Sequence, residues 1–367
     1  MKLFQRVPEN QWMSLEEYMD FVDETGITPL VGVNYNNHYH PDWMSEEESV
    51  AKAKRQAEYV VNTRGYKGAF FYIGNEDGVK NYPSRWRKHA MAVKEVDPTI
   101  KTIFNCNFLN PKALKTIVNS IGIDAIDGAE FHGKWPSGGS KVEPTTLLDW
   151  MEEVPLVNHQ HDYTYRGRTQ ELRNTLKEMG VTKDFILANN EFGLNNKRSI
   201  YPGFDRFTLS LVAVEMSLEM FKSGLDMMAF WDTIGQSGFN QESMMMDKSQ
   251  GYRMNPVHFG LEMLWRSVEM EMLEINTSAY RLHGFCARPK DISAKKQICY
   301  LLNKYDTERK IRFKNEYPIN TKVDVEILVD TEDHWGEVLT DKRTMMGRFF
   351  NYKIPALSFV TLTFDFS

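Results

Sequence analysis

Residues 185–193 read FILANNEFG, an apolar run that ends in an Asn-Glu pair and a glycine. Residues 68–76 read GAFFYIGNE and repeat this arrangement, with Glu76 at the end of the run. Short apolar runs of this kind are typical of strands buried on both faces of a parallel sheet. In closed parallel α/β sheets, functional residues stand at the C-terminal ends of the strands. The two runs therefore predict buried parallel strands that bring Glu76 and Glu191 to one functional edge.

Four more apolar runs, at 27–35, 100–107, 123–133 and 225–233, alternate with amphipathic stretches between residues 14 and 230. This alternation predicts βα units around a parallel sheet. In the first unit, Ser14 is the expected helix N-cap, Glu17 completes a capping box and Gly26 ends the helix. The six units together predict an α/β protein with a (β/α)8-type TIM barrel.

The rhythm changes after the apolar helix predicted at 257–268. Runs at 298–305, 322–330 and 358–366 alternate apolar and polar residues with a period of two, and turn residues separate them. Such patterning is typical of a small all-β sandwich. We therefore expect two domains, a barrel at 1–272 and a β-sandwich at 273–367.

Composition excludes several classes of protein. The formal net charge is −6 and the 44 Lys and Arg residues are spread along the chain, so no nucleic-acid footprint is expected. The start, MKLFQRVPEN, has no apolar signal-peptide core, and no window is apolar enough to span a membrane. The sequence does not assign a compartment. If it is part of a longer parent enzyme, we expect that enzyme to be secreted or periplasmic. Cys106, Cys286 and Cys299 are odd in number and lack metal-ligand spacing, so neither a disulfide framework nor a zinc site is expected.

Two glutamates at the ends of different strands suit the hydrolysis of a glycosidic bond with retention. Double displacement needs one protonated carboxyl group to assist the leaving group and one ionised carboxylate to attack the anomeric carbon. The alternative is that each glutamate is a strand-end residue paired with a nearby Arg or Lys. The repeated Asn-Glu pair favours the catalytic interpretation.

These motifs resemble those of clan A glycoside hydrolases. YIGNED (72–77) resembles the strand-four motif of the acid/base, and ILANNEFG (186–193) the strand-seven motif of the nucleophile. The resemblance extends to LVGVNYNN, GAEFHG and MMAFWDT, and KIPALSFVTLTF resembles the accessory β-sandwich of families 30, 39, 51 and 86. It implies that Glu76 is the acid/base and Glu191 the nucleophile. It further implies substrate-side roles for Asn34, Asn75, His132 and Trp231, with Asn75 on a 2-hydroxyl and Trp231 as a sugar platform.

Three further residues are candidates for substrate binding. His38 lies in NNHYHPDW, which is either a sugar subsite, a weak metal site or an ordinary polar loop. Trp135 lies in the Gly-rich segment HGKWPSGG, where stacking on a sugar ring is expected. Glu130 shares a strand face with His132, two residues later, and is expected to orient it or to bind a hydroxyl. We expect neither a metal nor a cofactor.

By this resemblance the run at 27–35 aligns with the third barrel strand, and no convincing strand precedes its helix. We therefore expect a barrel that is N-terminally incomplete. The predicted function is a retaining glycoside hydrolase acting on a polysaccharide, with an agarose- or porphyran-like galactan favoured by a likeness to family 86. Arabinofuranosides and xylosides are the alternative substrates, and a non-catalytic carbohydrate-binding barrel remnant is the alternative class. Carbohydrate is the expected partner, with no nucleic acid and no membrane, and the oligomeric state stays open.

Overall fold

The structure is a computed structural model that describes residues 13–33, 44–74, 83–105, 109–135, 146–152, 165–194, 203–231, 233–234, 243–246, 248–277 and 279–366. The chain divides into two compact units. The first comprises residues 1–132 and 171–189, and the second comprises residues 133–170 and 190–367. In the described segments, no helix is both long enough and apolar enough to cross a membrane.

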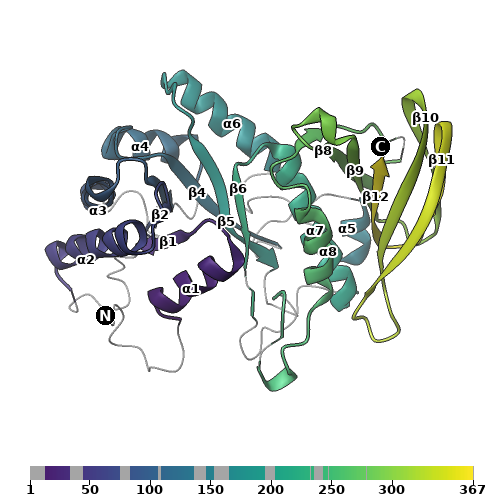
Figure 1. The fold of residues 1–367 in the computed structure, drawn as a ribbon, viewed down its shortest axis with the longest axis horizontal. Helices are drawn as coiled ribbons and strands as arrows, with labels where there is room; N and C mark the ends of the chain where they lie inside the picture. Colours follow the sequence, from purple (N-terminus) through teal and green to yellow (C-terminus); the bar gives the residue numbers. More distant parts are fainter. Residues whose placement is uncertain are drawn as a thin grey trace. The chain divides into compact units, whose positions relative to one another are not determined.

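A six-stranded sheet has the hydrogen-bonded order β1-β2-β3-β4-β5-β6 (Figure 1). Its strands are β1 (Leu30–Val33), β2 (Phe70–Ile73), β3 (Lys101–Asn105), β4 (Gly128–Trp135), β5 (Ile186–Leu194) and β6 (Met227–Phe230). The helices are α1 (Leu15–Thr25), α2 (Glu46–Glu58) with its π-helical extension η1 (Tyr59–Thr63), α3 (Pro83–Val96), α4 (Pro111–Ile121), α5 (Leu147–Glu152), α6 (Tyr165–Glu178), α7 (Arg206–Ser223), the 3-10 turn η3 (Lys248–Gln250) and α8 (Pro256–Trp265).

The first helix forms where its capping residues predict. The Ser14 hydroxyl accepts from the Glu17 N–H at 3.1 Å, and the Glu17 carboxylate accepts from the Ser14 N–H at 2.7 Å. Gly26 then ends α1 with a left-handed φ of 69°, which glycine adopts without steric cost. Leu15, Met19 and Val22 recur at helical spacing and form the buried face of α1.

Strands β1 to β4 pair in parallel with a regular register. Val33 lies beside Ile73, and Ile73 beside Phe104, so that the carboxyl ends of β1, β2 and β3 share one edge of the sheet. The last residue pair in the register of β3 with β4 is Asn105 beside Glu130. Strand β4 begins at Gly128, five residues later than the start of the predicted run at 123, because residues 122–126 form a turn after α4.

The C-terminal region forms the predicted β-sandwich from a second sheet, ordered β11-β10-β12-β9-β8-β7 and antiparallel in the pairs described. Its elements are β7 (Glu271–Leu273), β8 (Leu282–Arg288), the 3-10 turn η4 (Ile292–Ala294), β9 (Lys296–Asn303), β10 (Arg309–Val329), β11 (Glu337–Ile354) and β12 (Ser358–Asp365). One apolar face encloses a core of buried residues, among them Leu301, Val323, Val325, Phe350, Val360, Leu362 and Phe364. The parallel sheet and this sandwich confirm the predicted fold class. The domain boundary predicted after residue 272 falls within β7 and stays a prediction.

The expectation of no disulfide was wrong. Cys286 on β8 and Cys299 on β9 are directly opposite in the antiparallel ladder, both are buried, and they form a disulfide. An odd number of cysteines does not exclude one pair, and the pairing here follows from the register of two neighbouring strands. Cys106, the third cysteine, lies outside the described residues.

Helices α7 and α8 lie side by side in the second unit and pack against the sandwich, α7 on β8 and α8 on β11 (Figure 1). Residues 207–220 of α7 are all buried, including Glu215. The Glu215 carboxylate accepts from Lys304 Nζ at 3.0 Å and from Trp150 Nε1 at 2.5 Å, and both partners are fully buried. Burial raises the pKa of Glu215 to about 7 and lowers the pKa of Lys304, while their attraction opposes both shifts. This buried pair joins α7 to the end of β9.

Candidate functional site

Three polar side chains gather at the carboxyl end of β3 and on the part of β4 beside it, in the first unit. Asn105 ends β3, and Glu130 and His132 lie two residues apart on β4, so their side chains share a face. The Asn105 amide donates to Glu130 Oε1 and lies 2.8 Å from His132 Nε2. Glu130 is completely buried, and the His132 side chain is 7% exposed. Because one amide group has two N–H donors, Asn105 fixes both acceptors at once.

A different polar cluster lies at the amino end of the same strands. Asp127, just before β4, accepts from Lys94 Nζ at 2.5 Å, from the Thr102 N–H at 2.9 Å and from Lys183 Nζ at 3.2 Å. Burial alone would raise the pKa of Asp127, but these hydrogen bonds and the two lysine charges lower it overall. Every polar group of this cluster has a protein partner, and in barrels the amino-terminal edge serves stability. The carboxyl edge is therefore the candidate site.

In the second unit, Glu191 and Trp231 lie on neighbouring strands. Glu191 is in the carboxyl half of β5 and is half-buried. Trp231 follows β6 directly and is 46% exposed. Its backbone N–H donates to the Phe192 carbonyl at 2.7 Å. Phe192 and Phe230 meet edge to face beneath this contact, with ring centroids 5.3 Å apart. A carboxylate on β5 and an exposed tryptophan at the end of β6 therefore lie on two strands that are in direct contact.

Gly193 allows this close approach of β5 to β6. A Cβ atom at position 193 would lie 2.4 Å from the Trp231 carbonyl oxygen, closer than real side-chain carbons come. Only glycine therefore keeps the ladder beside Glu191 intact.

The remaining predicted residues fall at or beyond the limits of the described segments. Asn34, His38, Asn75 and Glu76 lie outside the described residues. The described residues before these positions end at Val33, the last residue of β1, and at Gly74, directly after β2. The Gly74 N–H donates to the Val33 carbonyl at 3.0 Å. The backbone of Trp135 ends β4, and its side chain is not among those described.

The sequence interpretation missed Asn105. The signal was present, because residues 100–105 are an apolar run that ends in a polar amide, as does the run before Asn75. Without an acidic neighbour in the sequence, this amide was not distinguished from an ordinary strand-end residue. Its importance lies in the register with Glu130, which a single sequence does not display.

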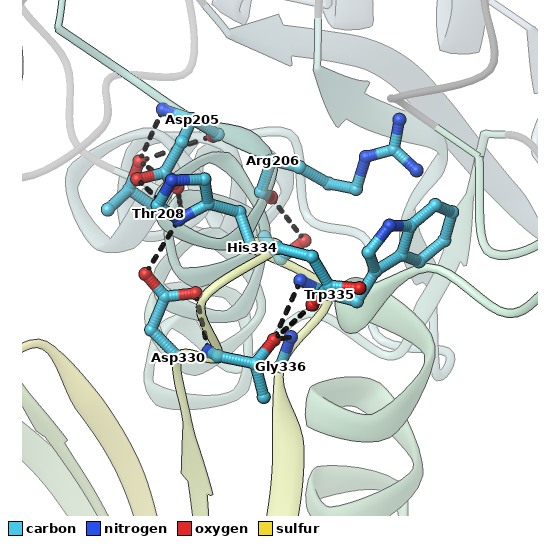
Figure 2. Close-up of polar contacts among 10 residues, drawn as sticks. Asp205, Arg206, Thr208, Asp330, His334, Trp335 and Gly336 are labelled. Atoms are coloured by element: carbon cyan, nitrogen blue, oxygen red, sulfur yellow. Dashed lines mark hydrogen bonds and ion pairs between the residues drawn. The ribbon is translucent and has the colours of Figure 1, made fainter.

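Asp205, Asp330 and His334 form the one group of three metal-ligand side chains within the described part of the chain, with ligand atoms within 4.8 Å of one another. Asp330 and His334 lie in the turn after β10 and Asp205 at the start of α7 (Figure 2), and the ion pair between His334 Nδ1 and Asp205, at 3.5 Å, connects the two. Asp205 caps α7 by accepting from the Thr208 N–H at 2.7 Å, and His334 Nδ1 donates to Asp330 at 2.9 Å. These bonds give the cluster a structural role in holding the turn.

Trp335 in the same turn lies between two guanidinium groups. The Arg206 carbon Cζ is 3.9 Å from the ring centroid and that of Arg253 is 3.5 Å away. Gly336 follows with a positive φ of 65°, and a Cβ atom there would lie 3.0 Å from the Phe207 ring. The turn is thus packed closely on α7.

Comparison with known proteins shows the fold. No protein-family model matches the chain, and no curated protein matches its sequence. An arabinofuranosidase structure covers 96% of the chain, which spans 79% of that protein, with a TM-score of 0.70 and 15% identity. The match to the α-L-arabinofuranosidase of Thermotoga maritima covers 96% of this chain and 78% of that protein, with a TM-score of 0.67 and 15% identity. The match to a family 44 endoglucanase from Clostridium acetobutylium covers 86% of this chain and 70% of that protein, with a TM-score of 0.56 and 15% identity.

We expect Gly193→Ala to disturb the site beside Glu191. The added methyl group would collide with the Trp231 carbonyl and separate β5 from β6. The free energy of unfolding, measured with urea, should fall by about 1–3 kcal/mol because of this overpacking. Gly32→Ala is the matched control, because its Cβ would meet only the Tyr72 side chain, at 3.3 Å. Equal effects of the two substitutions would contradict this role for Gly193.

We also expect His334 to make stability depend on pH. The hydrogen bond to Asp330 and the charges of Asp205, Asp330 and Asp333 raise the pKa of His334. Its contribution to stability is therefore complete below the unfolded pKa of about 6.5 and is lost as the pH rises through the higher folded value. Urea unfolding from pH 5.5 to 8.5 should show a smaller loss of stability in His334→Asn and in Asp330→Asn than in the unaltered protein. Parallel pH profiles for all three would exclude this interpretation.

Proposed function

We propose that this protein is a retaining glycoside hydrolase in which Glu191 is the nucleophile and Glu76 the acid/base. The observation that carries the proposal is the position of Glu191 in the carboxyl half of β5, with the exposed Trp231 directly after the neighbouring strand β6. This pair occurs in a chain whose fold, over 96% of its length, is that of solved arabinofuranosidases. An attacking carboxylate next to an aromatic platform is the arrangement that a sugar ring requires.

The proposed division of labour follows from the chemistry of double displacement. Glu191 attacks the anomeric carbon as a carboxylate while Glu76 gives its proton to the leaving oxygen. Once Glu191 carries the sugar its negative charge is gone, and Glu76, now a carboxylate, takes a proton from the incoming water. A separation of about 5–5.5 Å between the carboxyl groups is required for this sequence. Asn75 is proposed to bind the 2-hydroxyl group.

The Asn105–Glu130–His132 cluster is proposed to bind sugar hydroxyl groups. Its members are held by one another at the carboxyl edge of β3 and β4, so they are preorganised rather than ordered by the substrate. His132 keeps the substrate-side role suggested by the sequence motif, and Glu130 orients it through Asn105. Trp135 and Trp231 are proposed as the aromatic walls, and Asn34 and His38, which follow β1 in the sequence, as further substrate-binding residues.

Arabinofuranosides are the substrates we propose first. Two of the structures described above are named as arabinofuranosidases, and both cover more of the chain than the endoglucanase does. The galactan favoured by the sequence motifs stays a prediction, as do xylosides. A non-catalytic carbohydrate-binding protein is the second candidate, because the same aromatic and polar residues would retain a sugar without turnover.

Hydrolysis assays on two single variants test the proposal. On a panel of aryl glycosides and polysaccharides, with 4-nitrophenyl α-L-arabinofuranoside as first choice, Glu191→Ala should abolish turnover, and azide should restore it with inverted configuration. Glu76→Ala should lose about 10²–10⁴-fold in activity on poor leaving groups, keep slow cleavage of good ones, and give an azide product of retained configuration.

Lys248→Ala, on the exposed turn η3, is the control and should behave as the unaltered protein. Near-normal turnover in Glu191→Ala, or the same azide product from both variants, would exclude the assigned roles. Sugar binding without any turnover on the panel would favour the non-catalytic candidate.

A further inference from the structure

A basic groove lies on the hairpin of β10 and β11, wholly within the β-sandwich. Its volume is about 540 Å³, and among the described residues its lining includes Lys310, Arg312, Arg343 and Lys353 and no acidic side chain. This volume is within the range of roughly 300–1,000 Å³ found for ligand pockets. The groove involves none of the residues proposed for hydrolysis.

The strand register concentrates the charges of this groove. Lys310 lies directly opposite Lys353, and Arg312 lies opposite Asn351, so these four side chains share one face of the hairpin. The alternate residues Ile311 and Tyr352 pack against the core of the sandwich. Like charges directly opposite each other destabilise a strand pair. The Lys310–Lys353 pair therefore places two like charges next to each other, and the Glu308 carboxylate, 2.9 Å from Lys353 Nζ, forms an ion pair with Lys353 and not with Lys310.

Two of the four cations are left for a ligand. Arg343 pairs with Asp341 at 2.7 Å, and Lys353 pairs with Glu308 at 2.9 Å. Lys310 and Arg312 form no ion pair with any side chain in the described part of the sequence.

Arg312 is held in place by an aromatic ring. Its Cζ lies 3.8 Å from the ring centroid of Phe349, so the guanidinium group is stacked while its N–H donors stay available. A guanidinium group fixed in this way presents a planar fork that matches carboxylate and sulfate oxygens.

We propose that this groove binds an anionic glycan, one that carries carboxylate or sulfate groups. Lys310 and Arg312 bind the anionic groups, and the Asn351 amide on the same face provides a hydrogen-bonding group for the sugar. The choice of a glycan among polyanions rests on the proposed function. The groove would retain a charged polysaccharide on the sandwich while the barrel acts on its glycosidic bonds.

Affinity electrophoresis and calorimetry at low ionic strength test this proposal. The probes are polygalacturonate for carboxylate, carrageenan for sulfate, neutral arabinan and oligo(dT). Lys310→Gln/Arg312→Gln should bind one of the anionic glycans roughly 10- to 100-fold more weakly than the unaltered protein. The control variant Lys342→Gln/Arg348→Gln has the same charge change on the same hairpin but outside the groove. Its affinity for the glycan should fall by less than about threefold, because exposed charges outside the site contribute little. The glycan that shows this difference identifies the anionic group.

Equal losses of glycan affinity in the two double variants would mean that the binding is general charge attraction, and would overturn the proposal. Tighter binding of oligo(dT) than of both anionic glycans, or equal binding of neutral arabinan, would overturn it too. Urea unfolding midpoints confirm that both variants are folded. Because binding is measured without turnover, its failure is distinct from a failure of the proposed hydrolysis, which the aryl glycoside assay reports.

Discussion

Parallel pairing of β1 to β4 is the constraint on which the candidate site depends. It forces the carboxyl ends of successive strands onto one edge, and the register then decides which side chains become neighbours. Asn105 and Glu130 come together for this reason, although 25 residues separate them. The opposite edge shows the contrast, since Asp127 there is fully engaged by Lys94, Lys183 and Thr102. The amino edge is thus held by ion pairs and hydrogen bonds, and the carboxyl edge is the one we propose for chemistry.

Local signals in the sequence predicted much of the fold. Ser14, Glu17 and Gly26 define α1 through interactions that span a few residues, so the chain itself specifies them. Apolar runs likewise marked the six strands of the parallel sheet, and alternating runs marked the sandwich. Strand β4 was placed too early because Ala125 and Ile126, in the segment just before it, are buried as well, and periodicity does not separate them from a strand.

Features that depend on strand register could not be predicted in this way. The disulfide requires Cys286 and Cys299 to be opposite each other, which only the pairing of β8 with β9 decides. The same applies to Asn105, whose amide gains its role from Glu130 and His132. Glu130 and His132 were found because alternation along a single strand places them on one face. Glu191 and Trp231 were found through motifs, and the close contact between their strands depends on Gly193.

Covalent trapping of the glycosyl-enzyme intermediate tests the central claim most directly. A 2-fluoro-substituted aryl glycoside of the preferred sugar slows breakdown of the intermediate, so that intact and peptide mass spectrometry locates the attached sugar. The account predicts one added sugar residue per chain, on the peptide that contains Glu191, and no adduct in Glu191→Ala. Attachment to any other residue, or rapid turnover of the sugar substrate without a covalent adduct, would contradict it.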